Sequence, residues 1–232
     1  MSDSDLTFIT NEKDKSLLER FRVLIKDCDY FDALVGYFFI SGFYQLYPSL
    51  EDTDKVRILI GLETDKRTYD LLEKAKKQQE LPLNTHAETK KQMPEQILKE
   101  FEVSEDTSKI EEGVRKFIEW IRNGKLEIKA YPTDKIHAKL YVMTFKEGDR
   151  DKGRVITGSS NFSQSGLMDN LEFNVELKNP SDYDFALNQF NSLWENAVDV
   201  SEIYVNTIEK KSPYAEFTPY ELYLKFLYEY FK

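Results

Sequence analysis

The sequence predicts an α/β fold, with a mixed, mostly parallel β-sheet flanked by helices and a C-terminal helical extension. Two short runs, FDALVGYFFI at 31–40 and VRILIGL at 56–62, are almost continuously apolar, which is typical of strands buried on both faces. Other segments repeat apolar residues every three or four positions, which is the helical period. Strands of the first kind alternating with helices of the second favour a parallel or mixed sheet covered by helices.

Composition limits the class of protein. The chain has 232 residues, of which 41% are hydrophobic and 14% aromatic, enough for a packed core and too many for a disordered chain. A formal net charge of -10 argues against a basic coat for nucleic acid, although a local basic groove remains compatible with it. No signal peptide or membrane-spanning run is evident, and Cys28 is the only cysteine, so we expect a cytoplasmic protein that contacts no membrane.

The N-terminal part is expected to begin with a helix capped by Asn11. Its buried face would carry Leu17, Leu18, Phe21, Leu24, Ile25 and Cys28. The strand at 31–40, a short helical stretch at 43–50, the strand at 56–62 and a charged helix at about 66–79 would follow. The polar segment 80–106, which contains Pro82 and Pro94, predicts a loosely packed insertion.

The C-terminal part continues the pattern. We expect a helix at 108–122, a strand at 126–132, a hairpin formed by 136–145 and 154–157, a strand at 171–177, a helix from Pro180 to Trp194 and a shorter helical segment after Val200. Thr218 and Pro219 then open an aromatic amphipathic segment. The sequence therefore predicts one domain at 1–200, with the insertion at 80–106, and a helical extension at 201–232 that leads into a further downstream region.

The residues that suggest chemistry gather between Ile136 and Leu177. His137 and Lys139 alternate within IHAKLYVMTF, so both should lie on one face of a strand. The run RVIT ends at Gly158, followed by Ser159, Ser160 and Asn161, where a glycine allows a tight turn and small polar side chains supply hydrogen bonds. A nucleophile, a cation and neutral donors are the groups needed to attack a phosphodiester and to stabilise the developing charge.

Two further polar residues precede the next expected strand. Asn170 and Glu172 would reach the same sheet edge, where Glu172 could accept a hydrogen bond from His137 and fix its tautomer. The second histidine, His86, lies in the polar segment LNTHAETKK. An exposed loop histidine is favoured there over a catalytic partner.

The segments HAK at 137–139, GSSNF at 158–162 and NLEFN at 170–174 together resemble the motif of the phospholipase D superfamily. In that motif His-x-Lys is followed by Gly-Ser-x-Asn and, eleven positions after the asparagine, by a glutamate, which is the spacing from Asn161 to Glu172. The chain departs from the pattern in two respects. Thr144 stands where the family usually has an aspartate, and the hairpin is longer than the compact form.

The resemblance implies a phospholipase D-like fold and a phosphodiesterase that uses no metal or cofactor. One histidine would form a phosphohistidine while a second protonates the leaving oxygen. Because the chain has one such motif, the resemblance implies a homodimer that brings two copies of His137 together. It makes His137, Lys139, Asn161 and Glu172 the catalytic residues. Ser159, Ser160 and Asn170 would bind substrate.

The segments FDALVGYFFISGFYQL, VRILIGLETD and TPYELYLKFLYEYF also resemble the phospholipase D-like domain that precedes the ATPase motor of some bacterial helicases. This resemblance implies DNA as the substrate of a nuclease, and a downstream helicase or ATPase region as a partner. No Walker A motif occurs in the sequence. Two alternatives remain: a catalytically impaired module for DNA binding or dimerisation, and a lipid hydrolase acting at a membrane surface.

Overall fold

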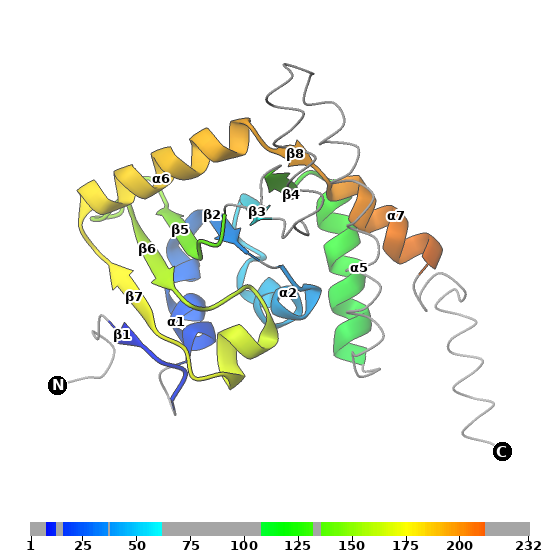
Figure 1. Cartoon of the computed structure of the whole chain (residues 1–232), viewed down its shortest axis with the longest axis horizontal. Helices are drawn as coiled ribbons and strands as arrows, with labels where there is room; N and C mark the ends of the chain where they lie inside the picture. The colour runs from blue at the N-terminus through cyan, green and yellow to red at the C-terminus, as the bar shows by residue number, and fades with distance from the viewer. Residues whose placement is uncertain (1–7, 13–15, 37, 62–107, 132–135, 212–232) are drawn as a thin grey trace, which may run out of the picture.

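The apolar runs of the sequence form strands of one mixed β-sheet. A computed structural model describes residues 8–12, 16–36, 38–61, 108–131 and 136–211. The strands are β1 (Phe8–Ile9), β2 (Cys28–Val35), β3 (Lys55–Gly61), β4 (Leu126–Tyr131), β5 (Leu140–Phe145), β6 (Gly153–Gly158), β7 (Asn174–Leu177) and β8 (Val198–Asp199). They form an eight-stranded sheet in the order β1-β7-β6-β5-β2-β3-β4-β8 (Figure 1). The predicted α/β class with a mixed sheet is therefore confirmed.

The parallel share of the sheet is smaller than expected. β2 pairs with β3, and β3 with β4, in parallel, whereas the remaining neighbours are antiparallel. Neighbouring strands joined by a short connection must run in opposite directions, as β5 and β6 do on either side of the segment 146–152. Apolar content alone does not distinguish such strands from parallel ones, because both are buried here on two faces.

Helices cover both faces of the sheet. They are α1 (Leu17–Leu24), α2 (Ile40–Leu46), α5 (Ser108–Arg122), α6 (Pro180–Glu195) and α7 (Ser201–Lys211), with short turns η2 (Ile25–Asp27), η3 (Tyr47–Ser49) and the π-helical η4 (Ser165–Asp169). Buried residues of α1, α2, α5 and α7 share the largest core cluster on one face. Residues of α6 pack in two smaller clusters on the other (Figure 1).

The hairpin strand β5 shows how alternation divides the core. Tyr141 and Met143 belong to the large cluster, while Val142 between them packs on the α6 side. Phe162, which follows the polar turn after β6, is fully buried in the large cluster. Its ring centroid lies 6.3 Å from that of Tyr141 and 6.1 Å from that of Phe31. The core therefore holds the chain in place directly after Asn161.

The end of the first helix differs from the prediction. Cys28 is buried as expected, but it begins β2 and does not lie on a helix. The helix ends at Leu24 and tightens into η2, so the strand begins before Phe31. Ser16 is the N-cap and accepts from the backbone N–H of Glu19. Asn11 nevertheless contributes to this terminus, because its Oδ1 accepts from the backbone N–H of Leu17 at 2.8 Å.

Other predicted elements agree with the structure in kind. The strand expected at 171–177 begins only at Asn174, and the two-residue strands β1 and β8 were not predicted because two residues carry no period. Part of the 201–232 extension packs on the domain, since Val205 and Ile208 of α7 are buried in the large cluster. The helix at 66–79, the insertion at 80–106 and the segment after 211 lie outside the described residues. The domain boundary at 200 stays a prediction.

The helices of the described part were also compared with the dimensions of a bilayer. In the ranges that the structure describes, no helix is both long enough and apolar enough to span a membrane.

Candidate active site

The predicted nucleophile and cation lie side by side at the start of β5. His137 and Lys139 occupy an extended segment that directly precedes the strand. The imidazole is exposed, whereas Lys139 is only 7% exposed. Lys139 Nζ lies 3.1 Å from His137 Nδ1 and 3.3 Å from its backbone oxygen. The prediction that the two side chains are neighbours is consistent with this geometry, although neither residue belongs to the strand itself.

Burial changes the acidity of Lys139. Removal of its ammonium group from water lowers the pKa of Lys139 below its ordinary value, and the carboxylate of Glu172 opposes this shift. The exposed imidazole of His137 therefore lies beside a lysine whose charged form is disfavoured by burial.

Gly36, which follows β2, lies beneath the site. A Cβ atom placed on Gly36 would be 3.6 Å from Asn161 Oδ1, 3.6 Å from His137 Cδ2 and 3.8 Å from Lys139 Nζ. Three predicted catalytic residues from two separate segments thus converge on one glycine. Sequence reasoning missed Gly36. The available signal was a glycine directly after the buried run FDALV, where ligands commonly approach the end of a strand.

The turn after β6 depends on a close backbone approach. A Cβ atom on Gly158 would lie 2.2 Å from the backbone oxygen of Phe173 and 2.5 Å from Asn174 Oδ1. Gly158 is not among the residues with positive φ in the described chain. A glycine is therefore required here because two strands approach closely, and not because the turn needs a left-handed conformation.

Asn174 fixes the position of Ser160 in this turn. Both residues are fully buried. Asn174 Nδ2 donates to Ser160 Oγ at 2.9 Å, and its Oδ1 accepts from the backbone N–H of Ser160 at 3.3 Å. Tyr141 Oη donates to the backbone oxygen of Ser160 at 2.9 Å. These contacts favour a supporting role for Ser160, whose predicted role in substrate binding stays a prediction. Sequence reasoning did not single out Asn174.

Ser159 and Glu172 form the next contact along the edge of the site. The Ser159 hydroxyl donates to Glu172 Oε2. Ser159 also exchanges hydrogen bonds with Phe173, whose backbone N–H lies 3.0 Å from Ser159 Oγ. Among the described residues, no hydrogen bond joins Glu172 to His137 within one chain. The predicted orientation of the imidazole by Glu172 therefore stays a prediction.

Asn170 lies apart from these contacts. Its backbone N–H donates to Ser165 at 2.8 Å, and its backbone oxygen accepts from Asn11 at 3.0 Å. The side chain is exposed. The described contacts do not connect this side chain with the other predicted site residues, so its role in substrate binding also stays a prediction.

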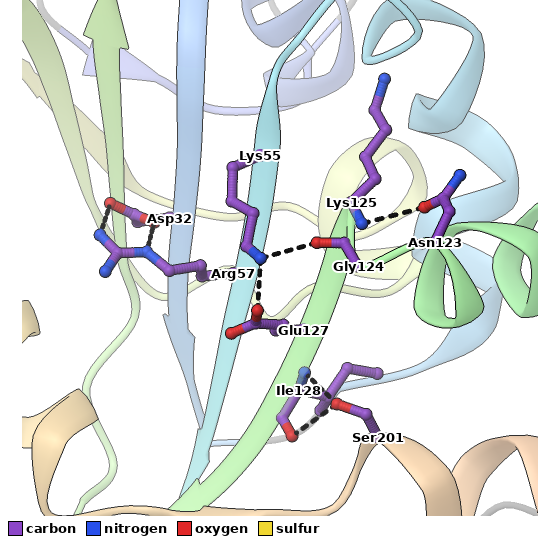
Figure 2. A network of polar contacts seen from close by, with 9 residues as sticks. All are labelled: Asp32, Lys55, Arg57, Asn123, Gly124, Lys125, Glu127, Ile128 and Ser201. Carbon is purple, nitrogen blue, oxygen red and sulfur yellow. Dashed lines mark hydrogen bonds and ion pairs between the residues drawn. The ribbon is translucent and has the colours of Figure 1, made fainter.

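A second polar cluster lies on the α6 face, toward the other end of the strands. Asp32 forms a two-pronged ion pair with Arg57, at 2.6 and 2.7 Å (Figure 2). Figure 2 also shows Lys55 between the backbone oxygen of Gly124 and Glu127. A groove of about 710 Å³ adjoins this cluster. Because its charged side chains are already paired, the cluster provides no obvious phosphate site.

Thr144, at the usual aspartate position, lines that groove. In the pairing of β5 with β2, Thr144 lies opposite Tyr30, near the start of β2. Leu140, at the other end of β5, lies opposite Leu34, which is close to Gly36. The Thr144 hydroxyl lies 2.8 Å from the hydroxyl of Tyr183. The position is therefore at the far end of β5 from His137, and Thr144 has a polar partner of its own.

Possible metal ligands do not gather in the described residues, where no group of three or more His, Cys, Asp or Glu side chains could hold an ion.

The fold and this site define an α/β domain with an exposed histidine beside a buried lysine. Residues 47–194 match the sequence model of a family described as "cardiolipin synthase, PLD-like domain", in which PLD denotes phospholipase D. The match covers more than half of the chain and includes His137, Lys139, Asn161 and Glu172. The chain belongs to the phospholipase D superfamily.

The chain is also similar to several solved structures, which include Nuc, NucT and a phosphatidylserine synthase. Nuc from Salmonella typhimurium, a phospholipase D family member, is 14% identical with a TM-score of 0.42, covering 77% of this chain and 87% of Nuc. NucT from Helicobacter pylori is 12% identical with a TM-score of 0.42, covering 79% and 90%. Phosphatidylserine synthase from Haemophilus influenzae is 13% identical with a TM-score of 0.46, covering 84% and 39%.

An archaeal chromatin protein, TrmBL2, described as binding DNA in a novel mode, is 14% identical with a TM-score of 0.40. The match covers 83% of this chain and about half, 53%, of TrmBL2. No curated protein matches the sequence. Family membership therefore rests on the match of residues 47–194 to the sequence model of the family.

Proposed function

We propose that the protein is a metal-independent phosphodiesterase that cleaves DNA through a phosphohistidine intermediate. The observation that carries the proposal is the convergence of His137, Lys139 and Asn161 on Gly36. An exposed imidazole suits attack on a phosphate in solution, and the cation and amide beside it suit its negative charge. Ser159 supplies a further polar contact at the same edge.

In the proposed reaction, a ring nitrogen of His137 attacks the phosphorus. The new N–P bond replaces the P–O bond to the leaving group, whose oxygen takes a proton from a second histidine. Water then attacks the phosphorus, gives its proton to that second histidine and breaks the N–P bond. Lys139 and Asn161 bind the phosphate oxygens throughout, while Glu172 orients an imidazole.

We assign the second imidazole to His137 of the partner subunit in a homodimer. The exposure of His137 supports this assignment, because a buried ring could not meet its own copy across a two-fold axis. A mixing experiment tests the dimer. When wild-type protein is co-expressed with excess His137→Ala, activity should fall as the square of the wild-type fraction. A linear decline would indicate that each chain works alone.

The DNA substrate, the cytoplasmic location and the association with a downstream helicase or ATPase region belong to the same proposal. The substrate and the downstream region rest on the sequence resemblance to helicase-associated domains, and the location rests on the composition of the sequence. The alternative is a catalytically impaired domain for DNA binding or dimerisation. Thr144 favours that alternative, because it replaces the carboxylate that is usual at its position.

The central test uses the two histidines as a matched pair. His137→Ala should abolish cleavage of DNA in the presence of EDTA and should prevent formation of an acid-labile phosphoprotein with a labelled substrate. His86→Ala, the control, should retain wild-type cleavage. Wild-type activity in the His137→Ala variant would overturn the assignment. DNA binding without cleavage or phosphoprotein in the wild-type protein would favour the impaired domain.

A further inference from the structure

Two exposed phenylalanines flank the proposed phosphodiesterase site. Phe173 is 63% exposed and Phe39 is 39% exposed, whereas Phe38 and Phe162 beside them are buried in the core. An exposed aromatic ring offers a flat apolar face on which a ligand can stack. Because both residues adjoin the proposed site, their rings are candidates for substrate binding.

Backbone hydrogen bonds tie both phenylalanines to the polar turn. The backbone N–H of Phe173 donates to Ser159 Oγ at 3.0 Å, and its backbone oxygen accepts from the N–H of Ser159 at 3.1 Å. The backbone N–H of Phe39 donates to the backbone oxygen of Phe162 at 3.0 Å. The two rings are thus carried by residues attached to opposite ends of the segment from Ser159 to Phe162.

Charge argues against duplex DNA as the preferred ligand. Affinity for a duplex comes mainly from several lysines and arginines that contact phosphates, but the chain carries a net charge of -10. Several basic side chains on this half of the sheet also pair with acids, as Arg20 does with Glu176, and Arg154 with Asp151. Stacking of bases on aromatic rings needs fewer cations, and it requires bases that are unpaired.

We propose that Phe39 and Phe173 stack on unpaired bases on either side of the phosphate held at His137, so that the preferred substrate is single-stranded nucleic acid. This inference rests on the proposed phosphodiesterase function and adds the conformation of the substrate. Lys139 holds the phosphate, and the two rings hold the neighbouring bases in the extended strand. A paired base would first have to leave its helix.

Binding is tested in a cleavage-deficient His137→Ala background. The probes are a fluorescent single-stranded oligonucleotide and an abasic oligonucleotide of the same length and charge. The parent should bind the base-bearing strand more tightly. Phe173→Leu and Phe39→Leu should each weaken that binding by roughly tenfold and leave abasic binding unchanged. Leucine keeps an apolar surface but removes the ring, and a tryptophan at either position should restore binding.

Phe185→Leu is the matched control, because Phe185 is 67% exposed but belongs to α6, on the opposite side of the sheet from α1 and α2. It should leave both affinities unchanged. The inference would be overturned if the parent bound the two probes with equal affinity. It would also be overturned if neither Phe39→Leu nor Phe173→Leu weakened binding of the base-bearing strand. A shift from dimer to monomer with the preference for bases unchanged would show that the rings pack on a second copy. Binding to phosphatidylglycerol vesicles that depends on the rings would show a lipid ligand.

The two proposals can fail separately. If the wild-type protein cleaves single strands but shows no difference between base-bearing and abasic probes, only the stacking inference fails. If the wild-type protein forms no phosphoprotein yet binds single strands through the two rings, the phosphodiesterase proposal fails and the protein is a binding module.

Discussion

The Nζ atom of Lys139 lies 3.1 Å from Nδ1 of His137, although the lysine is buried and the histidine is exposed. The two residues therefore have different proposed roles. The exposed ring is accessible to a substrate and to a second copy of the chain. The buried lysine is fixed in place, and its position relative to the ring is set by the fold.

The pH dependence of cleavage should reflect Lys139. Burial lowers the pKa of Lys139 from 10.5, and only its ammonium form binds phosphate. Cleavage should therefore decline as the pH rises through a value below 10.5. Lys139→Arg keeps its charge at any accessible pH, so a pH–rate profile of this variant should lose that decline, at a lower maximal rate. An unchanged profile would assign the decline to another group.

The free energy of unfolding should rise with pH through the titration of Lys139, whereas cleavage should fall. The folded-state pKa lies below the unfolded value of 10.5, so between the two values the unfolded chain binds more protons. The free energy of unfolding should therefore rise with pH within that interval, relative to Lys139→Met. Urea unfolding at several pH values measures this difference. A fall with pH would contradict the direction of the pKa shift.

Gly36 should tolerate a methyl group but not a larger side chain. A Cβ atom there would make ordinary contacts of 3.6 to 3.8 Å with Asn161, His137 and Lys139. Gly36→Ala should therefore fold normally and keep most activity. The branched side chain of Gly36→Val should occupy the phosphate position and reduce kcat/KM by roughly a hundredfold, equivalent to about 3 kcal/mol. Full activity of the valine variant, measured on a folded protein, would place the substrate elsewhere.

Asn174 should act as a positioning residue for the polar turn. Asn174→Ala removes both hydrogen bonds that Asn174 makes with Ser160 and leaves buried polar atoms of Ser160 without those partners, at a cost of about 1–3 kcal/mol. Cleavage should fall mainly through kcat, because the turn also carries Ser159 and Asn161. Asn206→Ala is the control, since Asn206 is exposed on α7 and its side chain donates a hydrogen bond to the backbone oxygen of Glu202. Equal effects of the two variants on kcat would exclude a positioning role.

The ion pair of Asp32 and Arg57 should matter for stability and not for cleavage. Asp32 is fully buried, and Arg57 also lies over the rings of Phe190 and Trp194 at 4.9 and 5.5 Å. Burial raises the pKa of Asp32, and Arg57 opposes this effect. Arg57→Leu leaves a buried carboxylate without its cation and should lower the free energy of unfolding by about 3–5 kcal/mol.

The double variant Asp32→Leu with Arg57→Leu provides the comparison for this pair. Removing both charges should recover part of the loss, measured by urea unfolding. If the double variant is less stable than Arg57→Leu alone, the buried carboxylate is not the cause of the loss. Retained kcat/KM in the folded double variant would agree with the distance of this cluster from His137.

The local sequence was sufficient to predict most elements. The buried runs predicted β2 and β3. The helical period, followed by Asn123 and Gly124, predicted that α5 ends at Arg122, as it does in the structure. Period and composition are local properties, so they remain readable without the fold. They failed where a local pattern has two interpretations. Cys28 fits the helical stripe by spacing, but the tight turn η2 places it at the start of β2.

The sequence by itself predicted the candidate site of this protein, because the types and spacing of His137, Lys139, Asn161 and Glu172 resemble a family motif. Only the tertiary structure decided which residues support that site. Gly36 and Asn174 are separated from His137 by many residues, and they reach the site through the pairing of β2 with β5 and of β6 with β7. Strand pairing is a long-range property. A single sequence specifies it physically but does not display it as a pattern.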